Sequence, residues 1–162
     1  MNWIAELEKI KLQLIAISNK LSMQKTNQTI LYETAKNTLG VKLIADEYED
    51  KGCALALNEI HRRAFGKEIG GGASTLALYQ SLMTDKTFEE VKDHQPGDVI
   101  ISPTTMGNGV ILNGHTGICG KHGIMSNTSA NGIWSQNMSY QYWNAYYGKR
   151  GGFPLLYFRK VG

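Results

Sequence analysis

Helical and strand patterns occupy separate parts of this chain of 162 residues. Up to about residue 82, apolar residues recur at the three- and four-residue spacing of amphipathic helices. We expect these helices at residues 3–21, 29–39, 53–65 and 75–82. Beyond that point the apolar residues form short runs bounded by turn-forming residues, which is typical of strands. We expect the strands at residues 88–91, 99–102, 115–119, 124–127 and 155–159. Helices followed by strands indicate an α+β fold with an antiparallel sheet.

A cysteine opens the third of these helices. One face of the helix carries Cys53, Ala56, Leu57, Ile60 and Ala64, and Gly66 follows as a suitable left-handed end. A helix N-terminus has partial positive charge and unpaired N–H groups, so it stabilises a thiolate and lowers the pKa of a thiol. Cys53 is therefore a candidate nucleophile. The alternative is that Cys53 is a small core residue, because free cysteine is among the residue types most often buried.

A histidine begins one strand of a predicted hairpin. We expect the strand from His115 to turn at residues 120–123 and return along residues 124–127, with Ile118 opposite Ile124. This register places Asn127 opposite His115, where its carboxamide would orient the imidazole and fix its tautomer. Ser126 takes that place only if the register slips by one residue. Alternatively, Asn127 is an ordinary residue at a strand end.

An ordered set of motifs resembles known cysteine hydrolases. The stretches Gln95–Ser102, Gly114–Ile118 and Ile124–Asn127 resemble the core of the NlpC-type and CHAP-type amidohydrolases and peptidases of the papain-like superfamily. More closely, residues 31–159 are similar to phage and bacterial proteins described as peptidoglycan amidohydrolases. The residues that carry this second resemblance are Cys53-Ala54, Phe65-Gly66, Ile69–Thr75, Gly97–Pro103, Ser126-Asn127, Gly132–Trp134, Trp143 and Gly151–Pro154.

The resemblance implies a catalytic set and a substrate. It implies Cys53 as nucleophile, His115 as general base and acid, and Asn127 as the orienting residue, although many relatives place Glu, Gln or a second His third. It also implies a papain-like fold, in which the nucleophile helix packs on the antiparallel sheet. The expected enzyme is a cell-wall lysin, either a cysteine peptidase or an N-acetylmuramoyl-L-alanine amidase, with peptidoglycan as its partner and no cofactor.

Two other classes of function remain open. A non-catalytic structural or binding component of a phage particle would keep the fold without the reaction. A deamidase or transferase directed at proteins would use the same Cys–His chemistry.

Composition limits the class of protein. The chain has 42% hydrophobic residues and 18 glycines, which fits one domain with a buried core. Its net charge of +3 is too small to predict a nucleic-acid partner, and no apolar run is long enough to predict a membrane span. The first residues lack the pattern of a secretory signal. We therefore expect synthesis in the cytoplasm and action on the cell wall after release, as a free lysin, a virion-attached lysin or a toxin.

The remaining cysteine and histidines suggest rival sites. A disulfide between Cys53 and Cys119 is disfavoured by the cytoplasmic origin. The spacing of His115, Cys119 and His122 resembles that of zinc ligands, but His122 falls in the turn and no fourth ligand is evident, so we expect no metal site. We expect His61 and His94 at the surface or behind the site.

Three further segments have distinct patterns. Residues 1–24 form a predicted amphipathic helix whose heptad seam is Trp3, Leu7, Ile10, Leu14, Ile17 and Leu21, suited to docking or self-association, or else to packing on its own domain. The hydrolase domain is expected to span residues 29–162. Within it we expect residues 70–72 to form a hinge or groove wall and Trp134 to form a groove wall or a core residue. Residues Tyr140, Trp143, Asn144 and Tyr147 share a helical face, which we expect in the core.

Overall fold

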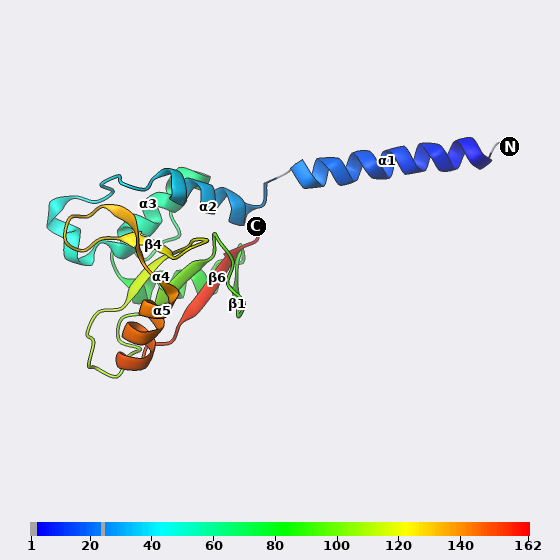
Figure 1. Cartoon of the computed structure of the whole chain (residues 1–162). Coiled ribbons are helices and arrows are strands. Elements are labelled where there is room, and N and C mark those ends of the chain that lie inside the picture. Colours follow the sequence, from blue (N-terminus) through cyan, green and yellow to red (C-terminus); the bar gives the residue numbers. More distant parts are fainter. Residues whose placement is uncertain (1–2, 24) are drawn as a thin grey trace.

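The computed structural model describes residues 3–23 and 25–162. Helix α1 (Trp3–Met23) extends away from the body formed by the other elements (Figure 1). The other helices are α2 (Asn27–Asn37), α3 (Cys53–Phe65), α4 (Thr75–Thr84) and α5 (Tyr140–Trp143), with a short 3-10 helix η1 (Asp46–Lys51) and a π-helix η2 (Asn144–Arg150). The strands are β1 (Phe88–Val91), β2 (Val99–Ser102), β3 (His115–Cys119), β4 (Ile124–Asn127), β5 (Trp134–Met138) and β6 (Leu156–Lys160). Within the described residues, no helix combines the length and apolar character needed to cross a bilayer.

The strands of the described chain form one antiparallel sheet in the order β1-β6-β2-β3-β4-β5. The predicted α+β fold is therefore confirmed, and α3 packs against β3 and β4 as expected. Helix α2 begins at Asn27, two residues before the predicted start, because the Thr26 side chain accepts a hydrogen bond from the Thr29 N–H and caps it. Strand β5 was not predicted, because Ser135, Gln136 and Asn137 interrupt any apolar pattern.

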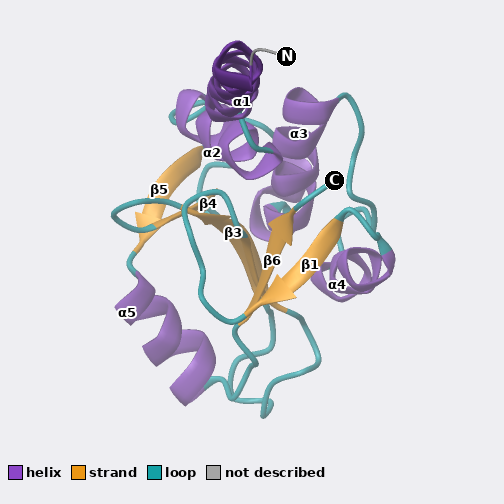
Figure 2. Cartoon of the chain, turned by 90° about the vertical axis from the view of Figure 1, so that its right-hand side faces the viewer, coloured by secondary structure: helices purple, strands orange, loops and turns teal. Residues whose placement is uncertain are grey.

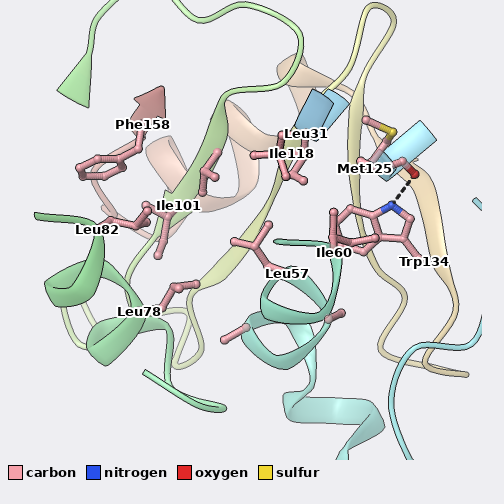
Figure 3. Close-up of a cluster of buried hydrophobic side chains, with 14 of the residues drawn as sticks. Leu31, Leu57, Ile60, Leu78, Leu82, Ile101, Ile118, Met125, Trp134 and Phe158 are labelled. Atoms are coloured by element: carbon pink, nitrogen blue, oxygen red, sulfur yellow. Dashed lines mark hydrogen bonds between the residues drawn. The ribbon is translucent and has the colours of Figure 1, made fainter. Parts of the chain in front are cut away.

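One face of the sheet is covered by α2, α3 and α4. The core on this face is apolar (Figure 3), and its fully buried side chains include Leu31, Leu57, Ile60, Leu78, Ile101, Ile118, Trp134 and Phe158. Trp134 is 0% exposed and its indole N–H donates to the Ala35 carbonyl, 3.1 Å away. Of the two roles expected for Trp134, the structure shows the core residue and contradicts the groove wall.

The other face of the sheet is covered by α5 and η2, which Figure 2 shows well separated from α2 and α3. The buried residues on this face are Ile100, Cys119, Ile124, Trp143, Tyr147 and Phe153. Trp143 and Tyr147 lie in the core as predicted, whereas Asn144 is exposed. The wider π-helical turn begins at Asn144 and alters the spacing on which the prediction for that residue rested.

The β3–β4 hairpin has a register one residue away from the predicted one. Ile118 pairs with Met125, and Cys119 pairs with Ile124. The turn explains this register. The Gly120 N–H donates to the Gly123 carbonyl at 2.8 Å, so these two residues are opposite each other and an even number of residues connects them. The predicted register needs an odd number. Because side chains alternate between faces, this one-residue difference brings Ser126 rather than Asn127 to the face of His115.

Strand β5 contains a bulge beside this hairpin. Met125 pairs with Gln136 but Ile124 pairs with Met138, so Asn137 is an extra residue in β5. A bulge bends the strand and redirects a side chain. Here the Asn137 side chain reaches β4, where its oxygen accepts a hydrogen bond from the Ser126 hydroxyl at 2.7 Å.

The predicted surface position of His61 is wrong. Its side chain is 0% exposed, its ring lies 4.8 Å from that of Phe65 and 5.7 Å from that of Phe88, and its Nδ1 lies 2.7 Å from the Lys67 carbonyl. The prediction rested on the neighbouring Arg62 and Arg63. His61 instead lies beside the buried Ile60, and its ring contacts Phe88 of β1. His94 is exposed and stacks on Tyr157.

Candidate active site

Cys53 is the first residue of α3 and is 9% exposed. It follows Gly52, where a side chain has no room: a Cβ atom there would lie 1.7 Å from the Ile44 Cδ1 and 2.8 Å from the Tyr48 carbonyl oxygen. The glycine lets η1 pass close to the start of α3. None of the described side chains caps the N-terminus of α3. The N–H groups of its first turn therefore have no side-chain cap and lie beside Cys53.

Burial governs the electrostatics of the thiol. Desolvation raises the pKa of Cys53 to about 11, against the opposing effect of the Thr116, Ala54 and Cys53 backbone N–H groups. The expected lowering of the Cys53 pKa by the helix N-terminus is therefore wrong, because the loss of water around the thiol outweighs the effect of the backbone N–H groups. Cys53 is a neutral thiol at neutral pH.

His115 begins β3 and is 5% exposed. Its ring stacks on Tyr147 at a centroid distance of 5.7 Å and lies 5.3 Å from the ring of Trp143. Burial lowers the pKa of His115 to about 4, so the imidazole is neutral at neutral pH. The preceding Gly114 has no space for a side chain, since a Cβ atom would lie 2.0 Å from the Ser102 carbonyl oxygen.

A chain of hydrogen bonds sets the tautomer of His115. The Ser126 hydroxyl donates to the Asn137 side-chain oxygen at 2.7 Å, so its single proton is used. Its oxygen therefore accepts from the Nε2–H of His115, 3.0 Å away. The Asn137 amide in turn donates to the Thr128 hydroxyl at 3.3 Å. Nδ1 of His115 is left unprotonated and able to accept a proton.

Asn127 is not brought to the His115 ring. It pairs with Trp134 of β5, shares the face of Met125 and is 2% exposed. The geometry expected for Asn127 is met by Ser126 with Asn137 behind it. The sequence analysis gave Ser126 as the alternative if the register slipped by one residue. It did not predict Asn137, because the polar residues around Asn137 show no strand pattern.

Two cavities meet at Cys53. The first, of about 360 Å³, is lined by Cys53 and His115 together with residues that include Tyr147 and Arg150. The second, of about 340 Å³, is lined by Cys53 together with residues that include Lys51 and Thr75. Both cavities also include Asn113 and Gly114 in their walls. The thiol thus lies between two hollows, and each hollow has a basic residue in its wall.

The other candidate groups lie apart from these cavities. Cys119 is a free, fully buried thiol whose pKa burial raises to about 12. Within the described part of the chain, no three His, Cys, Asp or Glu side chains gather as metal ligands would. Residues 70–72 are held by the Asn58 side chain, which accepts from the N–H groups of Ile69 and Gly70 and donates to the Gly70 carbonyl. This anchoring does not support a hinge, and Ala73, Ser74 and Thr75 form the nearby wall instead.

Comparisons with known proteins show a likeness to a solved structure. No protein-family model and no curated protein matches the chain. The fold is similar to that of a chain in the crystal structure of the native type VI effector–immunity complex Tae3–Tai3 from Ralstonia pickettii. The TM-score is 0.53 at 15% sequence identity, over 83% of this chain and 98% of the other. At this identity the likeness shows a common fold.

Proposed function

We propose that this chain is a cysteine hydrolase that cleaves an amide bond in cell-wall peptidoglycan. The observation that carries the proposal is the cavity that Cys53 and His115 both line. The Ser126 hydroxyl, which donates to Asn137, accepts a hydrogen bond from Nε2 of the His115 imidazole. A thiol, a neutral imidazole and a group that fixes its tautomer are the parts that nucleophilic amide hydrolysis needs.

The proposed reaction starts from neutral partners. As the Cys53 sulfur forms a bond to the amide carbon, its proton passes to Nδ1 of His115 and the carbonyl oxygen becomes an oxyanion. N–H groups of the first turn of α3 stabilise that oxyanion. The aromatic faces of Trp143 and Tyr147 stabilise the imidazolium. The C–N bond then breaks, His115 returns the proton to the leaving amine, and water hydrolyses the thioester.

The two cavities favour a substrate that extends on both sides of the cleaved bond. Cys53 belongs to both cavities, so a linear chain can occupy both while its amide lies over the sulfur. Arg150 in one wall and Lys51 in the other attract carboxylates. Peptidoglycan stem peptides are linear and carry free carboxylates, which supports their assignment as the substrate.

The route to the wall is part of this proposal. Of the three routes compatible with the sequence, the fold likeness to a chain of an effector–immunity complex supports an interbacterial effector. Such an effector would meet peptidoglycan in a neighbouring cell, and its producer would need a protein that blocks the cavity at Cys53.

Digestion of purified peptidoglycan tests the proposal, with fragments identified by mass spectrometry. Wild-type protein should release fragments, Cys53→Ala should release none, and Cys119→Ala should remain active because it makes the same change in a buried thiol outside the cavities. New amino termini within stems would identify a peptidase, and intact free stems an amidase. Fragment release by Cys53→Ala would refute the mechanism. Activity on proteins alone would favour a deamidase or transferase, and no product from either peptidoglycan or proteins would favour a non-catalytic component.

A further inference from the structure

Helix α1 exposes large apolar side chains to water. Trp3, Leu7 and Leu14 are 69%, 65% and 61% exposed, and Figure 1 shows α1 extending away from the body of the molecule. A helix with an apolar face is stabilised chiefly by burying that face against a partner. The arrangement in the structure therefore leaves room for a partner along α1.

The order of apolar residue types along α1 indicates what kind of partner fits. The spacing is that of a heptad in which Leu7, Leu14 and Leu21 occupy the first core position, called a. Ile10 and Ile17 occupy the second core position, called d, which Trp3 begins. Leucine at a with isoleucine at d favours coiled coils of more than two strands, in contrast to β-branched residues at a with leucine at d. The side chains of Ile17 and Leu21 lie outside the described ones, and their assignment rests on sequence position.

Charges beside the seam indicate the relative direction of the strands. Glu6 falls at position g and Lys11 at the following position e, on opposite sides of the core residues. In a parallel coiled coil, a residue at g lies next to the e residue of the next heptad on the neighbouring strand. Glu6 of one copy would then pair with Lys11 of the next, around the whole bundle.

We propose that α1 assembles three or four copies of this chain into a parallel coiled coil. The partner of the apolar seam is α1 of the other copies, and the hydrolase domains lie at one end of the bundle. This inference does not depend on the proposed catalytic function, since it uses only residues of α1.

Multi-angle light scattering of the full chain tests the number of copies. Wild-type protein should show about three or four times the mass of one 18.0 kDa chain. Leu14→Asp, which places a charge in the seam, should reduce the mass to that of one chain. Leu12→Asp is the matched control, because Leu12 is 65% exposed but lies on the outer side of the helix, and this variant should keep the wild-type mass. Near-ultraviolet circular dichroism should be unchanged in Leu12→Asp. In Leu14→Asp it should differ from wild type by no more than the contribution of Trp3, which lies in the seam.

Other masses would overturn the proposal. A single-chain mass for wild-type protein at about 100 μM, or equal loss in both variants, would show that the seam joins no copies. A dimer would overturn the assignment to more than two strands. A monomer whose α1 binds anionic lipid vesicles would assign the seam to a membrane surface instead.

Exchanging the charges tests the parallel direction. Glu6→Lys alone should lower the thermal stability of the assembly, because like charges then meet between neighbouring strands. The double variant Glu6→Lys with Lys11→Glu should restore it. An equal loss in the single and the double variant would overturn the parallel arrangement.

Discussion

The two faces of the sheet are built on different principles. Beneath α2, α3 and α4 lies the larger cluster of buried apolar residues, in which Leu57, Ile118 and Phe158 pack. The buried polar residues on this side, such as Asn58, are outside the candidate site. Beneath α5 and η2 the sheet carries His115, Ser126 and Ser102, and each of these has a hydrogen-bond partner on the same face. The larger apolar cluster therefore lies on one face, and the candidate chemistry lies on the other beside a smaller apolar cluster.

Cys53 connects the two faces. It belongs to a helix that packs on the apolar face, yet its sulfur lies in the cavity that contains Tyr147 and His115 from the polar face. A rigid apolar core fixes the position of the α3 N-terminus, and a polar network fixes the imidazole. The difference between the faces predicts that substitutions on them will have separable effects on stability and on activity.

The largest effect should come from the apolar face. Leu57→Ala removes a fully buried side chain and should lower the free energy of unfolding by about 3 kcal/mol, because it leaves a cavity in the core. Urea unfolding followed by circular dichroism measures this. Leu12→Ala, which makes the same change on exposed α1, should cost far less, and equal costs would contradict the stabilising role of the apolar cluster around Leu57.

Acid should weaken the polar face. The pKa of His115 in the folded state, about 4, lies below its ordinary value of 6.5, so the unfolded chain binds the proton first as the pH falls. The stability contribution is complete above pH 6.5 and is lost between pH 6.5 and 4, by about 3 kcal/mol in total. Burial lowers the pKa of His61 as well, and this adds to the same trend. Urea unfolding at several pH values should show a shallower pH dependence for His115→Gln, and an unchanged dependence would contradict the prediction.

The next effect distinguishes two neighbouring residues that face opposite ways. Ser126→Ala should lower kcat roughly 10- to 100-fold and leave KM nearly unchanged, because His115 loses the partner that fixes its tautomer. Asn127→Ala should lower kcat less at an equal folded fraction, since Asn127 lies on the other face. Steady-state kinetics on soluble peptidoglycan fragments compare the two. A larger loss in Asn127→Ala would return the orienting role to that residue.

A smaller effect is expected at the bulge of β5. Asn137→Ala removes the acceptor behind Ser126 and should lower kcat by roughly 3- to 10-fold, because the serine hydroxyl can then turn away from the required orientation. Gln136→Ala in the same strand is the control and should have little effect. Equal rates for Asn137→Ala and wild type would limit the network to His115 and Ser126.

Local patterns were sufficient to predict most of the fold. The periodicity from Cys53 to Ala64 predicted α3, and its end at Gly66 is confirmed by a φ of 77° there. Ser74 caps α4 in the same local way, because its side chain accepts from the Ala77 N–H. These features depend on residues close together in the sequence, and local physical preferences decide them.

The details of the site depend on long-range structure that such patterns do not contain. The hairpin register followed from the number of residues in its turn, and Asn137 reached Ser126 only through a bulge between β4 and β5. The pKa of Cys53 depended on how completely the folded chain excludes water from the sulfur. Neither the apolar periodicity of α3 nor its N-terminal position could predict that balance.

The turn between β3 and β4 makes the neighbour of His115 depend on length as well as on residue type. One extra residue between Gly120 and Gly123 would turn each side chain of β4 to the opposite face of the sheet. The Asn127 carboxamide would then lie where the Ser126 hydroxyl now lies, and Met125 and Ile124 would exchange faces. Single-residue insertions and deletions in this turn would therefore alter the orienting group with no substitution in either strand. Turn length, as well as residue type, therefore decides which group can orient the imidazole in this fold.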